Sequence, residues 1–163
     1  MGRKSILLLL LILVVIVVIY LVHEDKNKNR VINQKDISDL TNLWIHRVTV
    51  EHNPPAIAAM FCPGGSLVGT VSQIKRTGVD IERYFDYFAK LPGIRVISHN
   101  YNINQVAPNV FINTAFVTWY WDGLDQPVVA RMSFVYNGKC ISQLHSSVLP
   151  ERNEALVRDS GRA

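Results

Sequence analysis

The hydrophobic and polar positions of this chain divide it into four stretches with different patterns. Residues Ile6 to Val22 carry no charge and are all Leu, Ile or Val except for Tyr20. Residues 23–35 are polar, residues 36–150 show helical and then strand-like periodicity, and residues 151–163 are polar again. We therefore expect a transmembrane signal anchor over residues 1–22, a polar tether over 23–35, one folded domain over 36–150 and a flexible tail over 151–163.

The apolar stretch over residues 6–22 is just long enough to span a bilayer as a helix. At a rise of ~1.5 Å per residue it forms a helix of about 25 Å, near the lower limit for a bilayer span. A cleaved signal peptide is the alternative, but no small-x-small cleavage site follows Tyr20. We expect single-pass membrane localisation. Basic residues both precede and follow the span, so the charge pattern does not decide on which side the domain lies.

Within the domain, the spacing of apolar residues changes from about 3.6 to 2 after Pro92-Gly93. The first half predicts three helices with Asp36, Asn53 and Thr77 as N-caps. The predicted helices cover residues 36–52, 56–61 and 79–91, and the predicted strands cover 66–72, 94–101, 104–107, 110–121, 128–136 and 140–149. Helices followed by antiparallel strands predict an α+β domain.

The last two predicted strands form a β-hairpin around Asn137-Gly138, because both residues suit a type I′ turn. A two-residue turn at this point pairs Phe134 with Ile141. It also places Arg131 and His145 on opposite faces of the sheet. A one-residue bulge would exchange these partners, so both arrangements stay open.

A series of short motifs runs from about Ile37 to Pro150. They are Ala59-Met60-Phe61-Cys62-Pro63, Leu67 to Ser72, Arg76-Thr77, Tyr84 to Phe88, and Arg131 followed by Gly138-Lys139 and His145-Ser146-Ser147. In order and spacing they resemble SnoaL-like, nuclear transport factor 2-like domains, and among these the association domain of calcium/calmodulin-dependent protein kinase II. Cys140 stands where this family usually has Trp, and Leu144 stands where it often has a further His.

The resemblance implies a cone-shaped fold, in which N-terminal helices pack on a curved antiparallel sheet with a pocket at its mouth. In this chain one transmembrane helix would precede that fold. The resemblance also implies a homodimer through the sheet. The strand over 110–121 agrees, because both of its faces are apolar and the helices cover only one of them.

Charge and cysteine content narrow the possible partners. Residues 1–35 carry the whole formal charge of +4, and residues 36–150 are neutral. The domain therefore lacks the basic face that a nucleic-acid partner needs. Cys62 and Cys140 stand where apolar residues would serve, which favours buried free thiols over the single disulfide that they would permit.

Four residues are candidates for a ligand site, and none suggests a metal or a cofactor. His145 is the candidate catalytic acid or base, or an anion ligand; the alternative is a structural His beside Ser146. Arg131 lies between apolar neighbours and needs an acceptor, either a ligand carboxylate or an ion-pair partner within the domain. Tyr84 and Trp44 would form the apolar wall of the pocket, although most aromatic residues are expected in the core or at a subunit interface.

Two functions from different classes stay open. In the first, the chain is a membrane-tethered, oligomerising domain that binds a small anionic or apolar ligand without catalysis. In the second, it is an isomerase, cyclase or dehydratase that uses His145 as acid or base. The predicted strands over 110–121, 128–136 and 140–149 contain no Asp or Glu that could orient such a base, which favours the first function.

Overall fold

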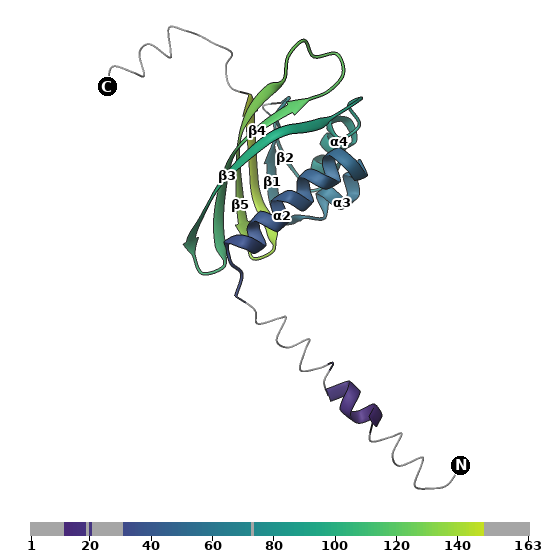
Figure 1. Cartoon of the computed structure of the whole chain (residues 1–163), viewed down its shortest axis with the longest axis vertical. Coiled ribbons are helices and arrows are strands. Elements are labelled where there is room, and N and C mark those ends of the chain that lie inside the picture. The colour runs from purple at the N-terminus through teal and green to yellow at the C-terminus, as the bar shows by residue number, and fades with distance from the viewer. Residues whose placement is uncertain (1–11, 19, 21–30, 73, 149–163) are drawn as a thin grey trace, which may run out of the picture. The chain divides into compact units, whose positions relative to one another are not determined.

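The computed structural model describes residues 12–18, 20, 31–72 and 74–148 (Figure 1). The chain forms two compact units, residues 1–31 and residues 32–163. In the first unit, residues 12–18 are helical. None of the helices described is both long and apolar enough to cross a membrane. The rest of the predicted span over 6–22, and the predicted tail over 151–163, lie outside the described residues.

Three helices and a short π-helix lie against one face of a single sheet (Figure 1). They are α2 (Gln34–His46), the π-helix η1 (Arg47–Glu51), α3 (Pro54–Ala58) and α4 (Val79–Phe88). The strands are β1 (Phe61–Val68), β2 (Lys75–Thr77), β3 (Arg95–Ala107), β4 (Val110–Tyr120), β5 (Val128–Asn137) and β6 (Cys140–Val148). The α+β layout is thus confirmed, while β2 was not predicted and the two strands expected over 94–107 are one.

Helix α2 begins two residues before its predicted start. Its N-cap is Asn33, whose side chain accepts a hydrogen bond from the Asp36 N–H at 3.1 Å. The Asp36 carboxylate in turn accepts from the Asn33 N–H at 3.0 Å, so the two residues form a capping box. The prediction of Asp36 as N-cap was therefore wrong. Ile32, just before the cap, is buried in the core, so the fold begins within the predicted tether.

The other two predicted caps had different outcomes. Asn53 caps α3 as predicted, because its side chain accepts a hydrogen bond from the Ala56 N–H at 3.1 Å. Thr77 does not cap α4, because it belongs to β2 and pairs with Ser66 of β1. The N-cap of α4 is Gly78, which has a positive φ of 55° that few other residues adopt.

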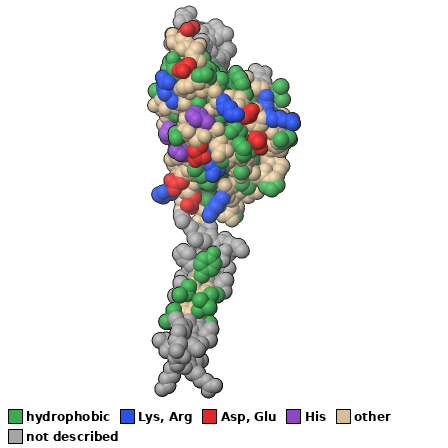
Figure 2. All heavy atoms as spheres, turned by 90° about the vertical axis from the view of Figure 1, so that its right-hand side faces the viewer, with side chains coloured by type: hydrophobic (Ala, Val, Ile, Leu, Met, Phe, Trp, Pro, Cys, Tyr) green, Lys and Arg blue, Asp and Glu red, His purple; other side chains and the backbone are tan. Residues whose placement is uncertain are grey.

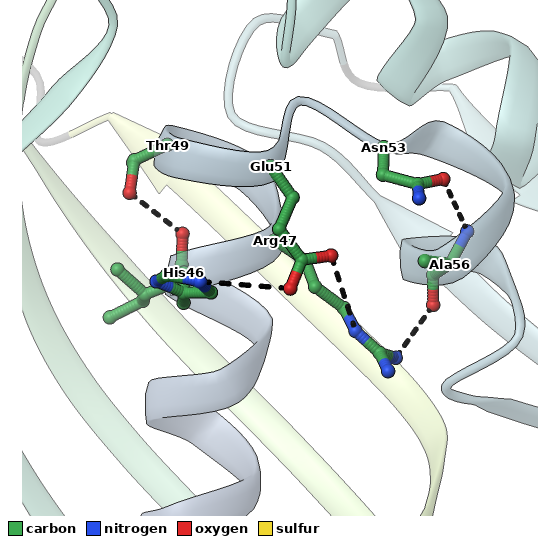
Figure 3. A network of polar contacts seen from close by, with 7 residues as sticks. His46, Arg47, Thr49, Glu51, Asn53 and Ala56 are labelled. Atoms are coloured by element: carbon green, nitrogen blue, oxygen red, sulfur yellow. Dashed lines mark hydrogen bonds and ion pairs between the residues drawn. The ribbon is translucent and has the colours of Figure 1, made fainter.

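The connection from α2 to α3 is held by side chains of η1 (Figure 3). Arg47 donates a hydrogen bond to the Ala56 carbonyl at 2.8 Å, which joins η1 to α3. Glu51 lies between two partners, at 3.6 Å from the His46 Nε2 and 4.0 Å from the Arg47 Nε. These contacts join α2 to η1 and η1 to α3, so the two helices pack on the sheet together.

The sheet has the strand order β2-β1-β6-β5-β4-β3. All neighbouring strands are antiparallel except β1 and β6, which run parallel. The sheet is therefore mixed, and the prediction of a purely antiparallel sheet was wrong at this pair. A parallel pair needs a long crossover, and here the chain between β1 and β6 supplies β2, α4 and three further strands.

The β5–β6 hairpin contains the bulge that the sequence left open. Its turn lies at Gly138-Lys139 and not at Asn137-Gly138, since Asn137 pairs with Cys140. The register then shifts at Ser142, whose hydroxyl donates to the Val135 carbonyl at 2.9 Å. Because of the shifted turn and the bulge, Phe134 pairs with Leu144 instead of Ile141. The side chains of β6 after Ser142 consequently point to the opposite face from the one that a hairpin without a bulge predicts.

Cys62 and Cys140 form a disulfide, so the prediction of free thiols was wrong. The two residues lie near the starts of β1 and β6, where Phe61 pairs with Ile141. Neither cysteine is fully buried. The parallel pairing, which the sequence pattern did not reveal, brings two residues that are 78 positions apart within bonding distance.

The core between the helices and the sheet is filled by aromatic side chains. The indole of Trp44, on α2, contacts Phe85, Trp119 and Phe134 edge-to-face, at centroid distances of 5.8, 6.1 and 5.3 Å. Such pairs contribute about 0.5–1.5 kcal/mol each beyond the area that they bury. The interior is consequently packed with side chains where the resemblance implied a pocket.

A buried hydrogen-bond network of three side chains joins α2 to the sheet. The Thr41 hydroxyl donates to the Ile37 carbonyl at 2.9 Å and lies 2.9 Å from the Tyr136 hydroxyl of β5. Asn113 of β4 donates its amide to the same Thr41 oxygen at 2.9 Å. All of these side chains are buried, so each hydrogen bond offsets a desolvation cost that would otherwise oppose folding.

Gly69 allows Tyr84 of α4 to close one end of the core. A Cβ atom at Gly69 would lie only 2.1 Å from the Cζ of Tyr84. The ring of Tyr84 stacks on Phe88 at 5.6 Å, so it cannot move aside without leaving the aromatic cluster. Burial raises the pKa of Tyr84 to about 12, because the phenolate would lose its hydration.

We predict that Gly69→Ala destabilises the domain by about 1–3 kcal/mol, the usual cost of overpacking. Chemical denaturation measures this change. In the background Tyr84→Val, which removes the ring, Gly69→Ala should cost much less, because the clash no longer exists. Equal costs in the two backgrounds would mean that Gly69 and Tyr84 do not make this contact.

Candidate functional site

A small cavity lies in the interior beneath the helices. It measures about 10 Å³, which holds at most about one water molecule. It is lined by Trp44, Leu67, Gly69, Thr70, Tyr84, Phe85, Phe88, Met132, Leu144 and Ser146. Its polar end is a short hydrogen bond of 2.5 Å between the Thr70 and Ser146 hydroxyls. A ligand larger than water has no room in this cavity.

The structure brings together two of the four residues predicted for the site. Trp44 and Tyr84 both line the small interior cavity, from α2 and α4 respectively. Both are buried and packed against other aromatic rings. They form an apolar wall, as expected, but around a space that their own side chains fill.

Arg131 and His145 lie elsewhere, on the face of the sheet that carries no helix. Arg131 pairs with Phe116 and Ser147, and His145 pairs with Ser133 and Val68. The bulge at Ser142 places both on one face, and both are exposed. Two roles were weighed for Arg131, a pocket residue and a member of an ion pair. Arg131 does not line the interior cavity, and no carboxylate of a described residue forms an ion pair with it. Their role in ligand binding stays a prediction.

An open depression of the domain lies between β2 and α4. We call it the β2–α4 groove; it has a volume of about 510 Å³ and is lined by Val71, Ser72, Ile74, Lys75, Arg76, Asp80, Arg83, Tyr84 and Tyr87. Volumes of about 300–1,000 Å³ are usual for small-molecule sites. Tyr84 lines both this groove and the interior cavity, so its ring separates the two.

Sequence reasoning missed the cations of this groove. Lys75 and Arg76 belong to a strand of three residues, which is too short to show a period of two. Arg83 follows the helical pattern of α4 as an ordinary exposed residue. The sequence shows only two adjacent cations just before a predicted helix. This pattern does not indicate which side chains will lie near them.

Charged side chains of both signs are interspersed on the face that Figure 2 shows. The ion pairs on α4 are local, between Asp80 and Arg83 at 2.8 Å and between Asp86 and Lys90 at 2.5 Å. Within residues 12–18, 20, 31–72 and 74–148, no cluster of three or more His, Cys, Asp or Glu is arranged to hold a metal ion.

The fold of this domain is found in other proteins. No protein-family model and no curated protein matches the sequence. Among solved structures, a putative calcium/calmodulin-dependent protein kinase II association domain from Xanthomonas campestris has a TM-score of 0.64 at 24% identity, over 74% of this chain and 90% of that one. A nuclear transport factor 2-like protein of unknown function from Cytophaga hutchinsonii has a TM-score of 0.50 at 19% identity, over 74% and 93%.

A third solved structure is a hypothetical protein with a ketosteroid isomerase-like fold from Catenulispora acidiphila, in complex with trimethylamine. It has a TM-score of 0.51 at 17% identity, over 66% of this chain and 82% of that one. At such identities the likeness establishes the fold alone. The domain has the nuclear transport factor 2-like α+β fold, as the order of the sequence motifs indicated.

Proposed function

We propose that the domain is a self-associating module held at a membrane by the apolar segment over residues 6–22. The observation that carries this proposal is the helix-free face of the sheet. Phe116, on β4, is a large aromatic residue of this face with 52% of its surface exposed. Its cross-strand neighbours in the same row are Asn100 and Arg131.

The rest of this face is rich in small or β-branched side chains and carries the cations Arg95, which pairs with Tyr120, and Lys75, which pairs with Val68. A second row consists of Thr114, Ser133, His145 and Val68, and a third consists of Ile112, Val135, Gln143 and Ser66. None of the six described strands contains Asp or Glu. An exposed aromatic residue on a face without carboxylates is typical of a subunit interface, where burial of Phe116 and its neighbours would stabilise a dimer.

The enzyme alternative finds less support. An interior cavity of about 10 Å³ holds no substrate, and His145 lies on the open face of the sheet. A general base usually needs a group that orients it and a site that excludes water. No strand carboxylate is available to His145 among the described residues. The same face is better suited to binding a second copy of the domain.

The disulfide supports a side of the membrane for this module. Disulfides persist in oxidising compartments and are rare in a reducing cytosol. The bond between Cys62 and Cys140 closes a long loop and joins two neighbouring strands. We propose that the span over 6–22 leaves the N-terminus in the cytosol and the domain on the oxidising side, a choice that the flanking basic residues leave open.

Self-association can be tested with a fragment that starts at Val31, which keeps every residue of the hydrophobic core. We expect a dimer by multi-angle light scattering. Phe116→Lys should give a monomer, because it places a charge beside Arg131 in the buried centre of the interface. Val50→Lys is the matched control: it changes an exposed apolar residue of η1 and should stay dimeric. A wild-type fragment that is monomeric at high micromolar concentration would refute the proposal.

The membrane proposal has its own test in the full-length protein. The protein should sediment with membranes after carbonate extraction. Without reductant, its cysteines should not react with a maleimide, since the chain contains only the two that are bonded. A mature N-terminus downstream of Val22 would show that the apolar segment is cleaved and is not an anchor. Reactive thiols in freshly isolated membranes would show that the domain does not lie on the oxidising side of the membrane.

A further inference from the structure

The β2–α4 groove is separate from the helix-free face and from the interior cavity. We propose that it binds a small organic anion, in which a carboxylate or phosphate contacts Arg76 and an apolar body lies along the groove. The proposal goes beyond self-association, because Arg76 pairs with the inward-facing Leu67 and so lies on the helix side of the sheet, not on the face that would be buried in a dimer.

Arg76 is held in place by three contacts before any ligand arrives. Its guanidinium lies 5.0 Å from the ring centroid of Tyr84 and donates to the Ile74 carbonyl at 2.8 Å and to the Ser72 hydroxyl at 3.0 Å. A guanidinium has five N–H donors, so donors are left over for an oxyanion. A cation that is already ordered loses little side-chain entropy when it binds, which favours affinity.

Among the described residues, no carboxylate is a counter-ion of Arg76. The carboxylate that lines the groove, Asp80, lies 2.8 Å from Arg83 and neutralises that residue. An uncompensated cation in a depression attracts an anion more strongly than an isolated surface cation does, because the low-dielectric walls focus its field.

The groove also has apolar surface in contact with water. Val71, Ile74 and Tyr87 are large hydrophobic residues with 41%, 66% and 62% of their surfaces exposed. A ligand that covers these three side chains removes their apolar surface from water, and this burial favours binding. Inorganic phosphate alone would leave them exposed, so the arrangement favours an anion with an apolar body of about the size of a benzene ring.

A guanidinium fixed in one orientation favours oxyanions that accept two parallel hydrogen bonds. Both a carboxylate and a phosphate monoester meet this requirement. The volume of about 510 Å³ suits a small molecule and not a polymer. The ligand class is therefore an aryl or short alkyl carboxylate or phosphate.

The test uses the full-length protein in nanodiscs of phosphatidylcholine and follows 4-fluorobenzoate and 4-fluorophenyl phosphate by fluorine NMR. Empty nanodiscs correct for partition into lipid. We expect at least one of the two anions to bind, and 4-fluorobenzyl alcohol, which lacks the charge, to bind far more weakly. Arg76→Met should weaken binding of the anion by roughly tenfold or more, because a charge-assisted contact is lost.

Arg95→Met is the matched control. Arg95 lies over the ring of Tyr120 at 4.2 Å and donates to the Gly93 carbonyl at 3.1 Å, so it makes the same kinds of contact outside the groove. It should leave binding unchanged. Because Arg76 also packs on Tyr84, Tyr87→Ser gives a second test at an exposed residue that lines the groove, and it should weaken binding by several-fold.

Three results would overturn the proposal: no binding of either anion to the wild-type protein, equal binding of the neutral alcohol, or equal losses in Arg76→Met and Arg95→Met. Light scattering on the same variants keeps this test apart from self-association. A protein that dimerises without binding the anion refutes the groove alone, and a monomer that binds it refutes only the dimer.

Discussion

The packing of Trp44 is the interaction on which the rest of the structure depends. Its indole stands at the centre of the cone and contacts rings from α4, β4 and β5 at once. Because these rings occupy volume between the helices and the sheet, the interior cavity that they line holds at most about one water molecule. The two surfaces that we propose to bind another molecule, the helix-free face of the sheet and the β2–α4 groove, both lie outside this cluster.

The bulge at Ser142 has a similar influence on the opposite face. It places His145 on the same side of the sheet as Arg131, away from the core, and turns Leu144 and Ser146 inward. The face that results combines an exposed Phe116 with hydroxyl and amide side chains and few charges. One additional residue in β6 thus decides which side chains a partner would meet.

Much of the fold could be predicted from the sequence because the responsible patterns are local. Asn53 before two prolines marked the start of α3, and the alternation along β4 separated the buried Trp119 from the exposed Phe116. Non-local features could not be predicted in this way. The parallel pairing of β1 with β6, and with it the disulfide between Cys62 and Cys140, joins segments that are far apart in the chain.

The site was harder to predict than the fold. Trp44 and Tyr84 were recognised as pocket residues by resemblance, but whether aromatic side chains line a cavity or fill it depends on how their rings meet in three dimensions. Here Gly69 allows the Tyr84 ring to lie against the backbone and close the cone. Arg76 reaches the groove and the ring of Tyr84 only because β2 pairs with β1 beside α4, which no local pattern indicates.

Hydrogen exchange at the indole N–H groups of Trp44 and Trp119 tests most directly whether the cone is closed. Both groups are buried, and neither has a hydrogen-bond acceptor within the described part of the chain. Protection by hydrogen bonding is therefore not involved, and only exclusion of water can slow their exchange. We expect both indoles to exchange only when the domain unfolds. Exchange as fast as that of an exposed indole under native conditions would mean that water enters the interior and that the aromatic core is not closed.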